Sequence, residues 1–593
     1  MFRAPSTAVS SAVYSLVIAG LAFAALAVAG ATLLWEPGHL FPGPAHDGIF
    51  DKLRFYRALT TWQDFVAYLI SPHNEHRILT TRLVAVADEM FFSGREHTLV
   101  VATNILQVAG ALGVFVLFFR WIGRGWSLFE AVFVAAVLLL LFVNSSFLYT
   151  LIVPFQLEHS IMGSLCLLAA ALMAEGSADE SSIRKPTLVV ILVALAIVAT
   201  FTLGNAPIIL LSAATISIVL RWSAKVTVSL IVLAGLHTAI SLAITPRVGS
   251  SSVEIVSVFK FLLIYLGSPL LRLDSWPAPF PAFSIHPYLA GAFGAGVLFV
   301  GVAFGSWRLV RRGAGGRLAV FGLALLMMIV ATGLAAGVSR AQFGILEAAN
   351  KKYASFAALG WVAVTAILCG LLAEIAPRLR LAPVIAVCVT ALPLCALAHQ
   401  RETLIWGNYV DRMWEVSTAV LSQSNVHAPL EMYTSKEGMR EYAGYIQSRR
   451  RGLFAQFPVA WGDDIDPFLA SRSEAVCRSE VQSLTPVLPG DRVEIFPVDG
   501  FPAVAQGWTW LTNDNAPATT IIAVDQNRRV VGVARSTRTS GRAEEWLGQH
   551  FHRPLGWLGY VRLLIPGTVE FIALSRDGRS FCRLGGVGNV RTG

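Results

Sequence analysis

The stretch from Ser71 to Arg77 combines several chemically active side chains between the first two long apolar segments of the chain. It holds two imidazoles, a carboxylate and a guanidinium, from His73, Glu75, His76 and Arg77. Ionisable groups this dense require water, a partner or a substrate, because unpaired charge in hydrocarbon is very costly. A carboxylate that is partly shielded from water, with cations nearby, can accept a proton from a hydroxyl. Glu75 is therefore the first candidate for a general base.

The neighbouring cations indicate an anionic ligand. The planar fork of arginine donates two parallel hydrogen bonds to phosphate, and a polyprenyl phosphate is one anion found at a membrane surface. We expect His73, His76, Arg77 and Arg82 to bind such an anion or to orient the base. A divalent cation held by His73, Glu75 and His76 is an alternative, although their spacing matches no known ligand signature. The plainest interpretation is a solvated loop and helix cap.

Three other carboxylates compete with Glu75 for the role of base. Asp47 and Asp51 follow the first apolar segment, and Asp88 belongs to the only adjacent acidic pair of this loop. Asp47 precedes Gly48, so it also fits a simple turn. The sequence does not choose among these four carboxylates.

Two further polar clusters lie later in the chain. Glu158 and His159 open an apolar helix, where a carboxylate is also a good partner for the helix dipole. The second cluster contains Arg340, Lys351, Lys352 and Tyr353. Basic residues there oppose the usual charge bias of membrane proteins, which favours a substrate phosphate over ordinary headgroup attraction. All three clusters fall on one predicted side of the membrane, so we expect them to converge on one site.

Membrane-spanning helices must position these residues. The 593 residues are 55% hydrophobic and only 14% charged, which is typical of a polytopic membrane protein. About eleven apolar runs are long enough to cross a bilayer. They lie near residues 10–34, 98–119, 128–151, 158–174, 187–203, 206–220, 226–245, 287–307, 318–338, 354–375 and 381–399.

The basic residues of the short loops predict the orientation. They gather on one side together with Arg3, and with an odd number of spans this side is cytoplasmic and the C-terminal part lies outside. The first outer loop, residues 35–97, is also basic, but long loops are translocated largely regardless of charge. The net charge of +9 is thereby explained, and no nucleic-acid partner is expected. A second large outer loop, 246–286, contains an apolar segment that we expect to lie in the interface, because Glu254 and Lys260 interrupt it.

The chain changes character after the membrane domain, residues 1–399. Residues 400–483 are typical of a helical linker region, and residues 484–593 show short strands separated by turns, which predicts a small β-sandwich or jelly roll. Cys477 and Cys582 are the only cysteines in this polar part, and an oxidising compartment would allow them to pair. The tryptophans of this region, such as Trp508 and Trp557, could stack on sugars, but burial is their commoner role.

This arrangement resembles the GT-C superfamily of integral membrane glycosyltransferases. His73-Asn74-Glu75-His76-Arg77 and the segment from Arg340 to Tyr353 look like patterns of bacterial members. The order of a first outer loop, many spans and an outer β-rich domain is also similar. One departure is that no adjacent acidic pair directly follows the first span.

The resemblance implies an enzyme of the bacterial inner membrane with a periplasmic C-terminal domain. Such enzymes take a sugar from a polyprenyl-phosphate donor, with inversion, and pass it to a glycan, lipid or protein of the cell envelope. A single deprotonating carboxylate suffices, because phosphate is already a good leaving group. The rival interpretations are a glycan ligase or acyltransferase with another donor, a transporter or flippase for lipid-linked glycans, and a non-catalytic assembly protein. A transporter would favour ionisable residues in mid-span and a repeat between halves, and the sequence shows neither clearly.

Overall fold

The computed structural model divides the chain into two compact units. One, which we call the helical unit, comprises Met1–Gly38, Leu69–Val84 and Leu99–Leu404. The other, the mixed unit, comprises His39–Tyr68, Ala85–Thr98 and Ile405–Gly593. The residues described are 7–41, 47–73, 76–177, 183–203, 206–244, 254–269, 287–310, 316–424, 436–457, 459–487, 496, 500–538, 555–584 and 588–589.

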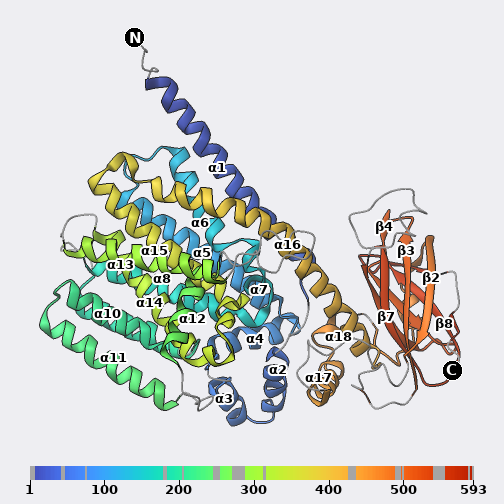
Figure 1. Ribbon diagram of the computed structural model, residues 1–593. Helices are drawn as coiled ribbons and strands as arrows, with labels where there is room; N and C mark the ends of the chain where they lie inside the picture. The colour runs from blue at the N-terminus through green and yellow to red at the C-terminus, as the bar shows by residue number, and fades with distance from the viewer. Residues whose placement is uncertain are drawn as a thin grey trace. The chain divides into compact units, whose positions relative to one another are not determined.

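Long apolar helices make up most of the helical unit (Figure 1). They are α1 (Thr7–Trp35), α5 (His97–Ile122), α6 (Leu128–Phe142), α8 (Leu157–Gly176), α11 (Ala224–Ile244), α13 (Pro287–Val310), α14 (Gly316–Arg340), α15 (Lys351–Ile375) and α16 (Ala382–Leu421). The shorter helices are α7 (Leu148–Ile152), α9 (Lys185–Thr200), α10 (Pro207–Val219) and α12 (Ile255–Gly267). Five 3-10 turns of this unit are η2 (Ser145–Phe147), η3 (Pro154–Gln156), η6 (Ala341–Phe343), η7 (Ile345–Ala349) and η8 (Pro377–Leu379), and η1 (Glu36–His39) follows α1.

Nine stretches within the described residues are long and apolar enough to cross a membrane. Nine of the eleven predicted spans correspond to them, and the other two correspond to α9 and α10. These two helices have 16 and 13 residues. At about 1.5 Å per residue they extend over roughly 24 and 20 Å, which is less than the ~30 Å hydrocarbon core of a bilayer.

The centre of the helical unit lies around α14. This helix packs against α8, α12, α13 and α15, and most of its span is buried. The spans α1, α5 and α11 instead expose large apolar side chains, including Phe23, Ile105 and Val232. An apolar outer surface around a packed centre is what lipid surroundings require. The apolar segment of the second outer loop, which was expected to lie in the interface, forms α12 and packs closely against α13. A Cβ atom added to Gly267 or Gly294 would lie about 2.0 Å from a backbone oxygen of the facing helix, so only glycine fits at these two positions.

The mixed unit contains residues of the first loop, C-terminal helices and a sheet. Its helices are α2 (Asp47–Ala58), α17 (Lys436–Ser448), α18 (Leu453–Gln456) and α19 (Asp466–Leu469), together with parts of α3 (Trp62–Ile70) and α4 (Leu79–Phe92). The aromatic rings of Tyr56 and Tyr445 stack with centroids 5.4 Å apart and join α2 to α17. Arg57 and Glu441 form an ion pair between the same two helices.

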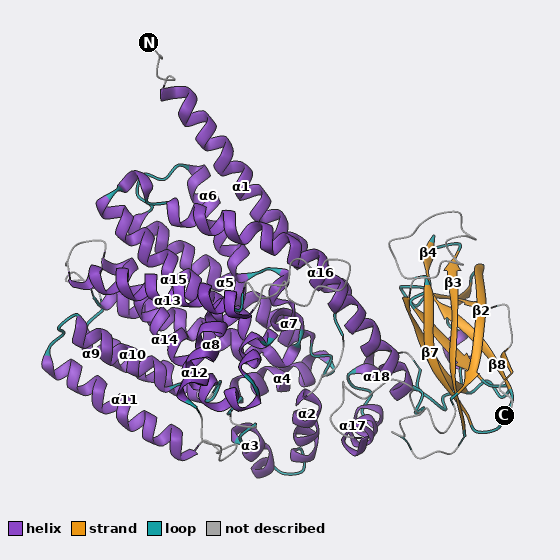
Figure 2. Cartoon of the chain, in the orientation of Figure 1, coloured by secondary structure: helices purple, strands orange, loops and turns teal. Residues whose placement is uncertain are grey.

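The C-terminal strands form one curled sheet instead of the predicted two-sheet sandwich (Figure 2). The strands are β1 (Ser473–Glu474), β2 (Cys477–Pro486), β3 (Phe501–Leu511), β4 (Ala516–Pro517), β5 (Thr520–Val524), β6 (Val530–Arg538), β7 (Gly556–Leu563), β8 (Thr568–Leu574), β9 (Ser580–Arg583) and β10 (Gly588–Asn589). Their order is β1-β9-β8-β5-β6-β7-β3-β2, with β10 paired to β8 and β4 to β3. Only the β1–β9 pair is parallel among the pairs described.

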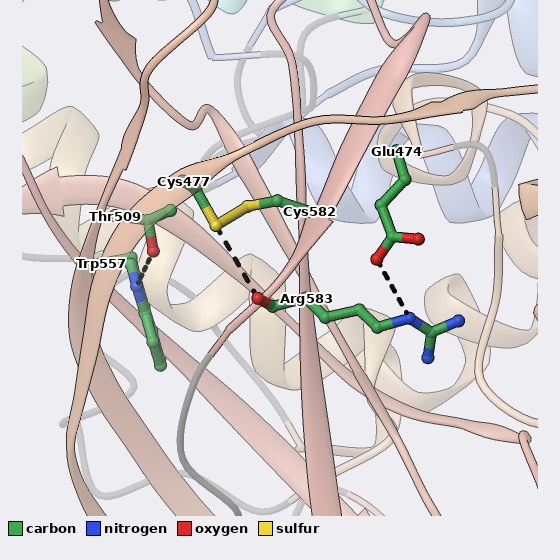
Figure 3. Close-up of a disulfide and its surroundings, with 6 residues drawn as sticks. All are labelled: Glu474, Cys477, Thr509, Trp557, Cys582 and Arg583. Atoms are coloured by element: carbon green, nitrogen blue, oxygen red, sulfur yellow. Dashed lines mark hydrogen bonds and ion pairs between the residues drawn. A yellow bond between two sulfur atoms is a disulfide. The ribbon is translucent and has the colours of Figure 1, made fainter.

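The chain itself joins the two ends of this strand order. Ser473 in β1 pairs with β9, and Cys477, four residues later, starts the β2 pairing with β3. A disulfide between Cys477 and Cys582 links the same two ends (Figure 3). One face of the sheet buries a core that includes Trp557 and Phe571, and Ile465 and neighbouring apolar residues cover the other face. The sheet therefore needs no second sheet to bury its apolar side chains.

Candidate functional site

Two backbone hydrogen bonds connect His73 and His76 in the polar loop of the helical unit. The backbone nitrogen of His73 donates to the His76 oxygen at 2.6 Å, and that of His76 donates to the His73 oxygen at 2.9 Å. The His73 ring also packs against the ring of Phe155, with centroids 4.8 Å apart. Glu75, the preferred candidate for the base, lies outside the described residues. The structure therefore positions the two imidazoles that flank it in sequence.

Side chains from all three predicted polar clusters meet in the helical unit. His76 interacts electrostatically with His73 and Lys352, and His159 interacts electrostatically with His76 and Lys352. We call His73, His76, His159 and Lys352 the His/Lys cluster. Burial, followed by the charges of His73 and Lys352, lowers the pKa of His76 to about 4. The His76 imidazole is therefore neutral at pH 7 and can either donate or accept a hydrogen bond.

The start of α8 adds a carboxylate and an amide. Pro154 begins the 3-10 turn before this helix, and the first residues of α8 are fully or nearly buried. Glu158 Oε1 lies 3.8 Å from His159 Nδ1, which places a carboxylate beside the cluster. Gln156 Oε1 is buried and has no hydrogen-bond partner among the described residues. A buried acceptor of this kind is costly unless a ligand or water supplies a donor.

A polar cap holds Lys352 at the start of α15. Asn350 Oδ1 accepts a hydrogen bond from the backbone nitrogen of Lys352 at 3.2 Å, which caps the helix. Asn350 also donates to Glu347 Oε1 at 3.1 Å, and that oxygen lies 3.6 Å from Lys352 Nζ. The ammonium group therefore has a defined position beside the Glu347 carboxylate.

The other predicted ligands of the 340–353 segment have different surroundings. The Tyr353 ring packs against Phe261 and Tyr265 of α12, with centroids 6.1 and 5.9 Å apart. Arg340 ends α14, and its guanidinium lies above the ring of a nearby phenylalanine. Lys351 begins α15, but its side chain is outside the described residues. The packing of Tyr353 indicates that it positions the start of α15.

The two arginines of the loop hold backbone oxygens. Arg82 is fully buried, and its Nη1 donates to the Ser71 oxygen at 2.6 Å and to Ser71 Oγ at 3.1 Å. Arg77 donates to the Ile70 oxygen and, at 3.2 Å, to the Ile244 oxygen. These bonds use donors that the predicted phosphate contacts would need, so in this structure both side chains position the loop.

Three of the four carboxylates proposed as the base belong to the mixed unit. Asp88 is fully buried and accepts hydrogen bonds from the backbone nitrogens of Glu96 at 2.7 Å and Thr98 at 3.2 Å, so it caps the start of α5. Asp51 is buried and accepts a hydrogen bond from the Tyr68 hydroxyl at 2.9 Å. Asp47 begins α2, with its side chain outside the described residues. The His/Lys cluster belongs to the helical unit.

One carboxylate of the helical unit was missed by sequence reasoning. Glu36 follows α1 directly and is only 4% exposed. Burial raises its pKa to about 7, and a hydrogen bond with the Asn104 side chain opposes this shift. Asn104 itself donates to the backbone oxygens of Val100 at 3.1 Å and Leu151 at 3.3 Å. A single acidic residue after an apolar run has no spacing signal, which is why the sequence did not single it out.

A second group of buried charges, in the mixed unit, was also missed. Lys52 Nζ lies 3.4 Å from Glu89 Oε2 and 3.4 Å from Glu96 Oε1. Burial is the main cause that raises the pKa of Glu96 to about 7, while the charge of Lys52 lowers it. The Tyr56 hydroxyl donates to Glu89 Oε1 at 3.1 Å. These contacts satisfy one another, which is typical of a structural network.

The helical unit also contains a partly open apolar cavity of about 230 Å³. Its walls come from α6, η2, α15 and α16, with Phe147, Trp361 and Leu394 among the apolar residues. The few polar groups include Asn144 and Ser146. A cavity of this composition suits a hydrocarbon chain.

Metal binding and the cysteine pair were two further predictions. Within the described residues, no group of three or more His, Cys, Asp or Glu side chains could hold a metal ion. Glu75, which the predicted cation site requires, is outside these residues. Cys477 and Cys582 form a disulfide with an S–S distance of 2.13 Å. Nearby, the buried Trp557 donates from Nε1 to Thr509 Oγ1 at 3.1 Å, so this tryptophan belongs to the core (Figure 3).

None of the protein-family models, curated proteins or solved structures compared with the chain matches it.

Proposed function

We propose that the protein is an inner-membrane glycosyltransferase that moves a sugar from a polyprenyl-phosphate donor to a glycan, lipid or protein acceptor of the cell envelope. The observation that supports this most is the convergence of His73, His76, His159 and Lys352 from three distant parts of the chain. The Lys352 ammonium group and the neutral imidazoles beside it favour an anion, because both kinds of group can donate hydrogen bonds to phosphate oxygens. Lys352 is the main phosphate ligand in this proposal, with His76 and His159 as hydrogen-bond donors.

The helical unit also has a candidate binding site for the lipid part of the donor. The apolar cavity lined by α6, α15 and α16 suits an isoprenoid segment, because the burial of hydrocarbon contributes about 0.8 kcal/mol per CH₂. The nine apolar stretches support membrane insertion. The basic loops support a cytoplasmic N-terminus, and the disulfide supports an oxidising, extracytoplasmic location of the C-terminal part.

The test is sugar transfer from a set of labelled polyprenyl-phosphate donors by the purified full chain in nanodiscs. Lys352→Met should weaken donor binding about 10- to 100-fold, since a charge-assisted hydrogen bond contributes about 1.5–3 kcal/mol. Lys260→Met is the matched control, because Lys260 is an exposed lysine of α12 and should leave binding unchanged. Failure of the unaltered chain to transfer sugar from any donor would overturn the proposal, as would equal binding by both variants.

A transporter of lipid-linked glycans is the second candidate function. Glu158 and His159 are buried within a candidate span, and so are Arg401 and Glu402 of α16. Buried ionisable residues in spans are frequent on transport pathways. Movement of a fluorescent lipid-linked glycan across vesicles containing the protein, without transfer of its sugar, would favour this candidate.

A further inference from the structure

The carboxyl group of Glu36 is buried although one of its oxygens lacks a hydrogen-bond partner among the described residues. Oε1 has no hydrogen-bond partner among the described residues, although the side chain is almost completely enclosed. The neighbouring acceptor, Asn104 Oδ1, also has no partner among these residues. Leaving a buried polar atom unpaired costs about 1–3 kcal/mol, and such exceptions concentrate where a ligand or a catalytic step supplies the partner.

Helix α5 connects Glu36 to the His/Lys cluster. Asn104, which contacts Glu36, and Gln107 are three residues apart, so they lie on one face of α5 on successive turns. Gln107 Nε2 donates to Ser160 Oγ at 2.9 Å, and Ser160 follows His159 directly in α8. The same helix face therefore contacts the buried carboxyl group and the helix turn that carries a cluster imidazole.

Burial raises the pKa of Glu36 to about 7, and the Asn104 hydrogen bond opposes this shift. Among the described residues, no charged side chain is a cause of the shift. Near Glu36, Thr32 lies one turn earlier on α1 and bonds Ser145 Oγ at 2.9 Å, which in turn bonds His399 Nδ1 at 2.6 Å. The titratable groups of α6 and α5 (Glu130, His97 and Arg120) lie at or near the helix ends. A base with a pKa close to the working pH is the most effective proton acceptor.

We propose that Glu36 is the general base that activates the acceptor hydroxyl. This assignment rests on the proposed glycosyl transfer. The acceptor O–H proton moves to Glu36 Oε1, and the acceptor oxygen forms the new bond to the anomeric carbon. The bond from that carbon to the phosphate oxygen breaks, and its electron pair leaves with the polyprenyl phosphate. Atoms and charge balance without a co-reactant, and Glu75 then has no proton to accept in this step.

The experiment compares Glu36→Gln, Glu75→Gln and the unaltered chain in single-turnover sugar transfer in nanodiscs. Glu36→Gln should slow transfer at least 100-fold while the dissociation constant of the donor changes less than 2-fold, because general bases contribute 10²–10⁴-fold. The rate of the unaltered chain should rise with pH through about 7, and this rise should disappear in Glu36→Gln. Glu254→Gln, which alters an exposed carboxylate at the start of α12, is the control that should keep both rate and profile.

Two results would overturn the assignment. If Glu36→Gln keeps the rate and the pH rise while Glu75→Gln loses them, Glu75 is the base and the proposed function stands. If the unaltered chain transfers no sugar, the proposed function fails and the role of Glu36 fails with it. Should Glu36→Gln not fold, Asn104→Ala gives an independent readout: removing the bond that lowers the Glu36 pKa should move the pH rise to higher pH. An unshifted profile in a folded Asn104→Ala variant would count against Glu36.

Discussion

At the scale of single residues, the His/Lys cluster offers one ammonium group and several imidazoles as hydrogen-bond donors to an anion. His76 and His159 both interact with Lys352, and His76 also interacts with His73. Glu347 Oε1 lies 3.6 Å from Lys352 Nζ, so a bound anion would share this cation with a carboxylate. His76 lies outside the candidate spans, and its titration can be followed through the stability of the folded protein.

His76 should make the protein less stable in acid. Its pKa of about 4 in the folded state lies below the ordinary value of 6.5, so between these pH values the unfolded chain binds the extra proton. The stabilising contribution is complete above pH 6.5 and is lost as the pH falls to about 4. We expect this loss to be about 1–2 kcal/mol, after allowing for the partial exposure of the ring. Thermal unfolding of the unaltered chain and of His76→Phe between pH 7.5 and 4 measures it, and parallel curves would refute it.

Single residues also show what could be predicted from the sequence and what could not. The three polar clusters were predicted to lie on one side of a membrane, because basic loops and apolar runs are both visible in a sequence. Glu36 could not be found, because its burial arises from packing in the folded chain and follows no sequence pattern. Asp88 was a candidate for the base, but its carboxylate caps the start of α5, and an aspartate can have either role.

At the scale of elements, buried charges of the mixed unit join segments that are distant in the chain. Lys52 in α2 contacts Glu89 in α4 and Glu96 just before α5, and Arg451 donates to the backbone oxygen of Glu89 at 3.0 Å. Gly94 lies in the turn between the two glutamates with a φ of +68°, and a Cβ there would lie 2.1 Å from Glu89 Oε2. The network therefore depends on a glycine as well as on the charges.

Removal of the central cation should unfold this network. Lys52→Met leaves Glu89 and Glu96 buried without their common partner, and breaking a buried ion pair in this way costs about 3–5 kcal/mol. The double variant Lys52→Met/Glu96→Gln should recover part of that loss, because one of the two carboxylates is then neutral. Chemical unfolding of the three chains measures the coupling. Equal stability of the single and double variants would show that Glu96 is already uncharged beside Lys52.

The apolar runs predicted most helices, but not how the short ones end. The segments that form α9 and α10 are as apolar as the longer candidate spans. Only the ends of these two helices in the structure show that each helix is shorter than the hydrocarbon core of a bilayer. The strands were predicted as short segments separated by turn residues, which carry no information on pairing. Whether β2 belongs to the same sheet as β9 or to a second sheet depends on how the whole chain folds, and the sequence shows only the local pattern.

At the scale of the whole molecule, the number of spans matters less than its parity. The eleven predicted spans and the nine candidate spans found in the described part of the chain are both odd numbers, so either number predicts that the two ends lie on opposite sides of a membrane. The orientation then depends on the basic loops, which predict a cytoplasmic N-terminus. The disulfide of the C-terminal sheet is an independent indication of the same arrangement, because such bonds persist in oxidising compartments.

The disulfide provides a test of both orientation and stability. Cys477 and Cys582 are 105 residues apart, and cross-links that close long loops restrict the unfolded chain most. We expect Cys477→Ser/Cys582→Ser to lower the stability of the mixed unit by about 2–5 kcal/mol, measured by denaturant unfolding of the full chain. In intact cells, a thiol reagent that does not cross the membrane should label Cys477, which is partly exposed, only after a reductant is added, whereas Cys582 is 1% exposed. The four remaining cysteines are buried in the helical unit and should stay unlabelled throughout. Free thiols at Cys477 and Cys582 in untreated cells would place the sheet in a reducing compartment and reverse the predicted orientation.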